Sequence, residues 1–189
     1  NMGVHFLLLT QPVGYETDGS GRVTQTTYPD GSTTRQTFDS LGRRTSVTNE
    51  EGQTTNFGYD GLGQLTSVSG HAGDANYAYD EVGNLVAQTD ALGRSTTFRY
   101  DALNRMIEKT YPGGDAERYA YDAVGNLVAR TDGLARTITF IYDEVDRLTT
   151  KTLPGGITIR YTYKPDGQRA TITEPRGVTT YSYDSVGQL

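Results

Sequence analysis

The stretch Tyr59-Asp60-Gly61-Leu62-Gly63-Gln64-Leu65 is written several times along this chain, and it decides the fold. The phrase returns at Tyr79–Leu85, Tyr121–Leu127 and Tyr183–Leu189, and looser copies start at Thr17, Phe38, Tyr100, Tyr142 and Tyr163. From Phe38 onward the copies start about every 21 residues. A fixed period of this length indicates a repeat protein, in which each copy packs against its neighbours. We therefore predict one repeat array over residues 17–189, with residues 1–16 belonging to a preceding unit.

Each copy of the phrase predicts a tight turn. Asp60 opens the turn, where its carboxylate can accept hydrogen bonds from backbone N–H groups, and Gly63 closes it with a positive φ. Asn104 and Asp146 replace the Gly, and these residue types tolerate the left-handed region. Lys164 replaces the Asp. The predicted structural turn residues are Asp39, Gly42, Asp60, Gly63, Asp80, Gly83, Asp101, Asn104, Asp122, Gly125, Asp143, Asp146, Gly167, Asp184 and Gly187.

A second turn, also ending in Gly, falls about halfway through most copies, as in Tyr111-Pro112-Gly113-Gly114. Ala135 stands where this Gly is expected, so we expect that turn to differ from the others. Two turns in each repeat leave two strands of about 6–7 residues. The repeat is thus predicted to be a β-hairpin.

Aromatic residues recur in pairs spaced by two, just before each first turn. This spacing places both rings on one face of a strand. The predicted aromatic face contains Phe57, Tyr59, Tyr77, Tyr79, Phe98, Tyr100, Tyr119, Tyr121, Phe140, Tyr142, Tyr161, Tyr163, Tyr181 and Tyr183. Hairpins joined in this way form one long antiparallel sheet with no second layer to cover it. Because sheets twist, we expect this ribbon to curl and to leave its terminal strands as exposed edges, which could self-associate.

Composition narrows the range of functions. The chain has a net charge of −6, 17 scattered Lys and Arg residues, and no Cys, which argues against a nucleic-acid surface and against thiol chemistry. No apolar stretch is long enough to span a membrane. The longest such run, Val4–Leu9, is interpreted as a strand of the preceding unit. Disorder is the alternative for so polar a chain, but the regular aromatic residues argue against it.

The Tyr-Asp-x-x-Gly-Arg/Asn-Leu phrase and its period resemble the RHS-repeat, or YD-repeat, family over about residues 17–189. That family includes bacterial polymorphic toxins, the C components of insecticidal toxin complexes, and teneurins. The resemblance implies an all-β fold of tandem β-hairpin repeats, forming a continuous curved antiparallel sheet that is an open segment of a spiral shell. It also implies a secreted or cell-surface bacterial protein that encapsulates or displays a toxin or effector domain of the same parent protein. Bacterial members often carry a self-cleaving Asp-Pro element; this sequence has no Asp-Pro, so no such site is assigned.

The recurring Asp, Tyr and Arg residues could each serve a binding function, but each also has a simpler structural role. The recurring Asp residues could bind Ca²⁺, but one carboxylate per turn is more simply a turn cap. The Tyr rows could stack on sugars in a carbohydrate-binding or adhesion module, the alternative function, but packing between hairpins is favoured. The arginines at the turn exit, Arg22, Arg43, Arg105 and Arg147, are interpreted as polar surface residues. His5 and His71 have no catalytic partners nearby, so the sequence predicts no enzyme, no metal site and no cofactor.

Overall fold

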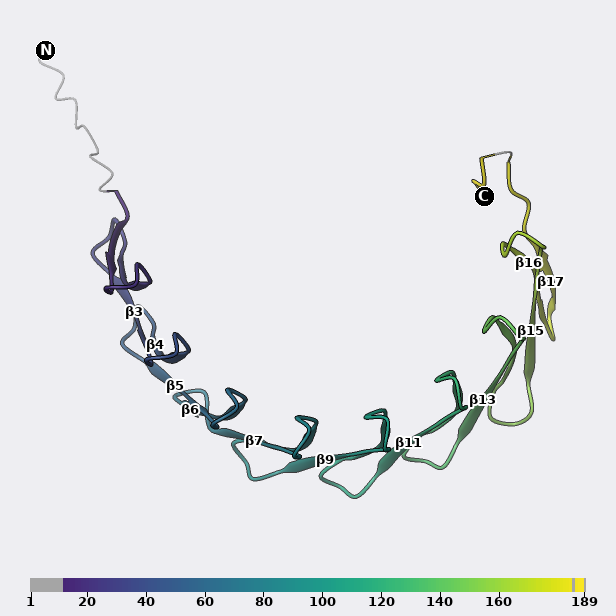
Figure 1. Cartoon of the computed structure of the whole chain (residues 1–189), viewed down its shortest axis with the longest axis horizontal. Helices are drawn as coiled ribbons and strands as arrows, with labels where there is room; N and C mark the ends of the chain where they lie inside the picture. Colours follow the sequence, from purple (N-terminus) through teal and green to yellow (C-terminus); the bar gives the residue numbers. More distant parts are fainter. Residues whose placement is uncertain (1–11, 185, 189) are drawn as a thin grey trace, which may run out of the picture. The chain divides into compact units, whose positions relative to one another are not determined.

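The computed structural model describes residues 12–184 and 186–188. Within this part the chain forms seventeen strands, every recorded strand pairing is antiparallel, and no residue is helical. The strands are 4 to 6 residues long, slightly shorter than predicted. The predicted fold class, tandem β-hairpin repeats in antiparallel sheet, is confirmed (Figure 1). Val4–Leu9, interpreted above as a strand, lies outside the described residues.

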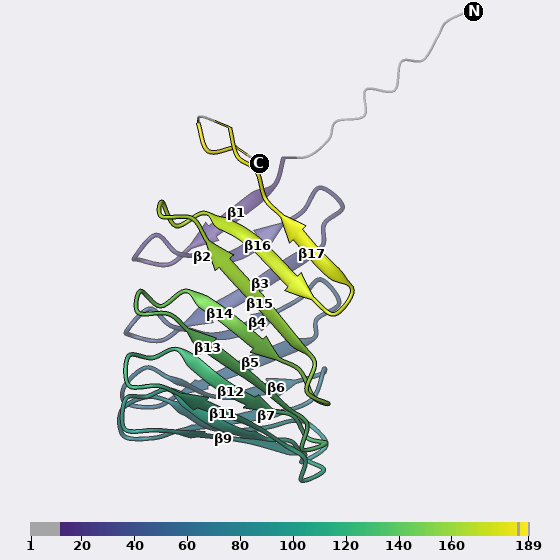
Figure 2. The same ribbon diagram turned by 90° about the vertical axis from the view of Figure 1, so that its right-hand side faces the viewer.

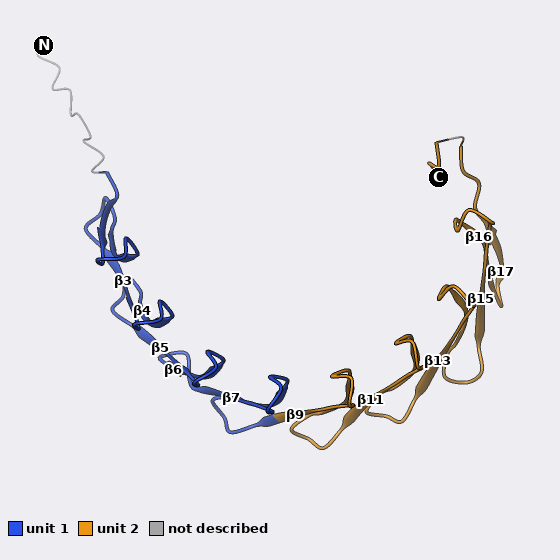
Figure 3. Cartoon of the chain, viewed as in Figure 1, with its two compact units in different colours: residues 1–95 blue, residues 96–189 orange. Residues whose placement is uncertain are grey.

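The chain divides into two compact units, residues 1–95 and residues 96–189 (Figure 3). In the first unit each strand pairs with the next along the chain. Its strands are β1 (Gly14–Thr17), β2 (Val23–Thr27), β3 (Thr33–Phe38), β4 (Arg44–Thr48), β5 (Thr54–Tyr59), β6 (Leu65–Gly70), β7 (Ala75–Tyr79) and β8 (Leu85–Thr89).

The second unit repeats the same sequential pairing from β9, the strand that contains the unit boundary. Its strands are β9 (Ser95–Tyr100), β10 (Met106–Thr110), β11 (Ala116–Tyr121), β12 (Leu127–Thr131), β13 (Thr137–Tyr142), β14 (Leu148–Thr152), β15 (Thr158–Tyr163), β16 (Arg169–Glu174) and β17 (Gly177–Thr180). Figure 2 shows these short strands lying side by side, with the connecting turns at their two ends.

Both kinds of turn close in the same way. At the first turn, the Gly63 N–H donates to the Asp60 carbonyl at 3.1 Å, and the Asp60 N–H donates to the Gln64 carbonyl at 3.0 Å. At the second turn, Gly52 and Asn49 make the equivalent bonds, each at 3.0 Å. A loop closed in this way has three residues, with a positive φ at the last of them. The turn between β16 and β17 differs, because Glu174 pairs with Gly177 and leaves a loop of two residues. Turn chemistry fixes the strand register at both ends of the hairpin.

A β-bulge follows the first turn and keeps the apolar residues of both strands on one face. Tyr59 pairs with Leu65, whereas Gly58 pairs with Ser67, so Thr66 is an extra residue in β6. The same shift occurs beside Tyr79, Tyr121, Tyr142 and Tyr163. Because of the extra residue, the strand after the turn can place two side chains, such as Leu65 and Val68, on the face that carries the rings.

The sheet forms a single layer, and among the described residues no side chain is buried. The apolar residue in the middle of each phrase is not a core residue but lies on the turn, where Leu62 is 79% exposed and Val124 is 74% exposed. The stabilising contacts must therefore come from half-buried side chains on the sheet faces and from the turns. A conventional hydrophobic core plays no part in this region.

The turn that contains Ala135 does not differ from the others, contrary to the expectation from sequence. Ala135 adopts a φ of 59°, its N–H donates to the Asp132 carbonyl at 2.9 Å, and the Asp132 N–H donates to the Arg136 carbonyl at 3.0 Å. The two closing hydrogen bonds and the Asp132–Arg136 ion pair at 2.7 Å hold the turn in its usual form. Here the neighbouring turn contacts override the backbone preference of alanine.

We predict that Ala135→Gly raises the free energy of unfolding by about 0.5–1 kcal/mol, because it relieves a left-handed alanine while adding some disorder to the unfolded chain. Ala123→Gly, in the turn that Asp122 opens, is the matched control, since Ala123 has no positive φ. That change should lower stability by about 0.4–1 kcal/mol. Chemical denaturation of the two variants measures both effects, and shifts of the same sign would contradict the account of this turn.

Candidate functional site: the aromatic face

The predicted aromatic side chains lie half-buried on one face of the sheet, here named the aromatic face. The half-buried rings are Phe57, Tyr59, Tyr77, Tyr79, Phe98, Tyr100, Tyr119, Tyr121, Phe140, Tyr142, Tyr161, Tyr163, Tyr181 and Tyr183. Residues between the rings, such as Ala78 and Ala120, are exposed on the opposite face. Tyr181 and Tyr183 follow β17 and are not in a strand, although Tyr181 still donates its N–H to the Ala170 carbonyl at 2.9 Å.

In most copies the tyrosine just before the first turn joins one hairpin to the one before it. The Tyr121 hydroxyl donates to the Met106 carbonyl at 3.0 Å. Backbone pairing between β10 and β11 extends only from Glu108–Arg118 to Thr110–Ala116, near the second turn. The two strands therefore have no ladder at their first-turn ends, and the hydroxyl takes the place of a backbone donor there. The equivalent bonds of Tyr59, Tyr79, Tyr142 and Tyr163 are 2.8 to 3.0 Å long.

An arginine at the exit of the first turn adds a second link between hairpins. Arg105 pairs with Asp101 of its own turn at 2.8 Å, lies over the Tyr121 ring at 4.8 Å from its centroid, and donates to the Asp122 carbonyl at 2.9 Å. Arg43 makes the same three contacts three repeats earlier. We name this set of contacts the arginine clamp. Arg22 and Arg147 likewise cover the rings of Phe38 and Tyr163, at 4.7 Å and 4.8 Å from the centroid.

Copies without the arginine keep a weaker form of this link. Asn126 donates to Asp122 of its own turn at 3.1 Å and to Asp146 of the next first turn at 2.7 Å. Gln64 donates to the Gly83 carbonyl at 3.4 Å. Interpreting this position as a polar turn exit missed its role between hairpins. The sequence did contain a signal for this role. Each of these arginines follows an aspartate by four residues and precedes an aromatic residue by sixteen.

The carboxylates of the turn are held by their own loops. Asp39 accepts hydrogen bonds from the N–H groups of Leu41 and Arg43 at 2.9 Å, and the Arg43 side chain at 2.7 Å lowers the pKa of this carboxyl. Hydrogen bonds from Arg94 and Arg136 likewise lower the pKa values of Asp90 and Asp132 in second turns. Among the described residues, no group of acidic or histidine side chains is arranged to hold a metal ion.

The remaining predicted turn residues occupy the same two positions of the first turn. Asp39, Asp60, Asp80, Asp101, Asp122, Asp143 and Asp184 each accept a backbone N–H bond on the side chain. A positive φ occurs at Gly42, Gly63, Gly83, Asn104, Gly125, Asp146, Gly167 and Gly187. Where Lys164 replaces the aspartate, Asp166 accepts the Gln168 N–H at 3.0 Å instead. The turns thus position the strands that carry the aromatic face.

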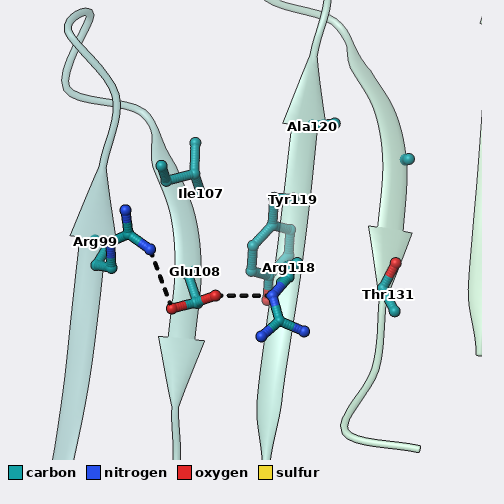
Figure 4. Close-up of a pocket in the computed structure, with 8 residues that line it drawn as sticks. Arg99, Ile107, Glu108, Arg118, Tyr119, Ala120 and Thr131 are labelled. Carbon is teal, nitrogen blue, oxygen red and sulfur yellow. Dashed lines mark hydrogen bonds and ion pairs between the residues drawn. The ribbon is translucent and has the colours of Figure 1, made fainter. Parts of the chain in front are cut away.

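The opposite face carries one charged cluster that sequence reasoning did not single out. Figure 4 shows Arg99 and Arg118 directed at the carboxylate of Glu108, at 3.5 Å and 2.8 Å. Together with Ile107, Ala120 and other residues they line an open depression of about 410 Å³. Both guanidinium groups are more than half exposed, at 69% and 62%. Exposed ion pairs of this kind contribute little to stability.

These features define a class of protein: a single-layer array of β-hairpins whose repeats are tied together along one edge by tyrosine hydroxyls and arginine clamps. The RHS Repeat family model matches residues 18–54, 38–75, 79–116, 121–158 and 142–179, which together span most of the chain. This chain therefore belongs to the RHS repeat family, as the resemblance indicated. None of the curated proteins matches it in sequence. None of its described residues forms a helix long and apolar enough to cross a membrane.

Solved structures share the fold at low sequence identity. A complex of TcdB2, TccC3 and Cdc42 matches 89% of this chain with a TM-score of 0.68 and 17% identity. A TcdB2–TccC3 structure matches 92% with a TM-score of 0.53, and a Tc holotoxin pore of Photorhabdus luminescens matches 94% with a TM-score of 0.50, both at 17% identity. The chain spans only 12% to 13% of the length of these relatives. At this identity the likeness establishes the fold alone.

We predict that Tyr121→Phe lowers the free energy of unfolding by about 0.5–1.5 kcal/mol, because the Met106 carbonyl loses its donor. Tyr161→Phe is the matched control, since the Tyr161 hydroxyl makes no hydrogen bond to any described residue and the ring stays under Arg169 either way. The control should be neutral within about 0.5 kcal/mol. Thermal and urea denaturation give the comparison, and equal losses in the two variants would remove the bridging role of the tyrosine.

We further predict that Arg105→Gln destabilises the protein more than Arg94→Gln. Arg105 loses a ring contact and a hydrogen bond to the next hairpin, for which about 1–2 kcal/mol is expected. Arg94 is 61% exposed, and within the described residues its side-chain hydrogen bonds and ion pairs are confined to Asp90, so its loss should cost at most about 0.5 kcal/mol. Hydrogen exchange should show increased opening of the strands that flank Arg105. A larger effect at Arg94 would show that the clamp adds nothing.

Proposed function

We propose that this chain is a non-enzymatic wall segment of an RHS-repeat shell that encapsulates or displays a toxin or effector domain of its parent protein. The single observation that carries the proposal is the one-layer sheet without a buried side chain among the described residues. A compact binding domain or enzyme normally builds its site on a close-packed core. A one-layer sheet held by contacts between adjacent repeats is suited instead to forming an extended wall.

The side chains support a structural role. The charged groups of the first turns are occupied by the turns themselves and by the clamps to neighbouring hairpins. The rings that a sugar would need are covered, since guanidinium groups lie over Tyr59, Tyr121 and Tyr163. The hydroxyls of the same three residues already donate to backbone carbonyls. This arrangement favours a wall over a carbohydrate-binding or adhesion module.

The proposal includes a secreted or cell-surface location in a bacterium, with the effector domain of the same parent protein as the partner. It includes no cofactor and no nucleic-acid partner. Its support is the family membership and the low-identity likeness to structures of toxin complexes. The organisation into residues 1–16 and a repeat array over residues 17–189 remains part of the proposal.

The test uses the parent protein with its effector domain. In the intact protein we expect the effector to resist a protease that digests the isolated effector rapidly. Weakening the wall with Tyr121→Ala, which removes a half-buried ring and its hydrogen bond at a cost of about 1.5–3 kcal/mol, should restore cleavage. Tyr161→Phe is the control that leaves protection unchanged. Rapid cleavage in the unmodified protein would overturn the proposal. So would binding of a defined glycan that is lost when Tyr161 is replaced by alanine.

A further inference from the structure

Three consecutive even-numbered strands of the second unit place a cation in the middle of the aromatic face. Lys109 in β10, Arg130 in β12 and Lys151 in β14 occupy equivalent register positions, opposite Phe98, Tyr119 and Phe140. We name these three residues the basic row. The same position holds apolar residues at Val47 in β4, Val68 in β6 and Ile172 in β16, and uncharged polar residues at Thr26 in β2 and Gln88 in β8. Among the described strands, three adjacent repeats thus place a charge where the other repeats have an uncharged side chain, which is the kind of local conflict that marks functional positions.

The basic row is not neutralised by its surroundings. Glu117, the acid that faces it, accepts the Arg130 guanidinium at 3.0 Å and the hydroxyls of Tyr111 and Tyr119 at 3.0 Å and 2.6 Å. Lys109 lies over the Tyr111 ring at 4.5 Å from its centroid, and Lys151 has no ion pair among the described residues. Three cations face one carboxylate, so this part of the aromatic face has a net positive charge within an acidic chain.

We infer that the basic row binds an acidic polypeptide segment in polyproline II conformation that runs across the strands. Alternate strands are two inter-strand steps apart, so successive cations recur about every 9.6 Å. A polyproline II helix has three residues per turn and advances about 9.3 Å in each turn. Carboxylates at every third residue would therefore meet Lys109, Arg130 and Lys151 in turn. The half-buried rings beside the cations resemble the aromatic-lined grooves that such helices use.

A single-stranded nucleic acid is the competing ligand for a surface of cations and rings. It fits less well, because the basic row is one short line of charge on a chain with a net charge of −6. The inference deepens the proposed function, since it names the chemistry of the segment that the wall would hold. Peptide binding is measured on this chain alone, so its failure leaves effector protection in the parent protein unaffected.

The experiment measures fluorescence anisotropy of a labelled peptide of four Glu-Pro-Pro triplets titrated with the 189-residue chain. Lys109→Gln combined with Lys151→Gln should weaken binding about tenfold, at roughly 0.2–1 kcal/mol for each ion pair. Arg160→Gln, which removes a charge from the opposite face of the same unit, should change the affinity less than about twofold. Glu117→Gln should strengthen binding, because it releases Arg130. Melting curves establish that each variant is folded, and Lys151→Arg should retain binding.

The comparison peptides decide the outcome. A peptide of the same composition with its glutamates gathered at one end should bind more weakly, and a Lys-Pro-Pro peptide should not bind. Equal affinity for the gathered and spaced peptides would overturn the proposed register. Tighter binding of oligothymidylate would overturn the choice of ligand. An equal loss in Arg160→Gln and in Lys151→Gln would show that only net charge matters, and would overturn the site.

Discussion

The structure depends on one constraint: adjacent hairpins share a backbone ladder only near the second turn. At the first-turn end, side chains must do what the backbone does elsewhere. The hydroxyl of Tyr121 reaches the Met106 carbonyl, and Arg105 reaches both the Tyr121 ring and the Asp122 carbonyl. This explains why the second aromatic of each pair is tyrosine in most copies, while phenylalanine is accepted at the first. The second position is the one whose hydroxyl donates to a backbone carbonyl of the preceding hairpin.

The same constraint shapes the energetics. A sheet with no buried side chain in its described part cannot rely on a shared core, so stability must come from many modest terms between neighbours. Most first turns supply hydrogen bonds to their aspartate, and the junctions that carry the arginine clamp add a ring contact and a bond across the hairpins. Such terms are individually about 0.5–1.5 kcal/mol and act only on adjacent units. Substitutions on the face of one repeat, such as those that form the basic row, therefore need not disturb distant repeats.

Much of this fold could be predicted from the sequence, since turns are encoded locally. Gly63 and Asn104 share a position whose φ is positive, and residue chemistry alone indicates that requirement. The arginine clamp could not be predicted in the same way. Arg105 and Tyr121 meet only after a second turn brings the next hairpin alongside, and a polar exit is the simpler interpretation of the sequence. Ala135 was misjudged for the related reason that turn contacts outweigh its backbone preference.

The two ends of the hairpin also differ in how freely their length can change. Val47 pairs with Thr55, whereas Val68 pairs with Ala75 and Ile172 with Thr179, so the connection through the second turn is one residue shorter in the last two cases. Among the described strands, every pair joined by a first turn keeps the same connection length, because the loop must position the arginine, the aspartate and the tyrosine together. Insertions, deletions and grafted peptides should accordingly be accommodated along one rim of the sheet only. For protein engineering, that rim is the place to attach new segments without breaking the link between repeats.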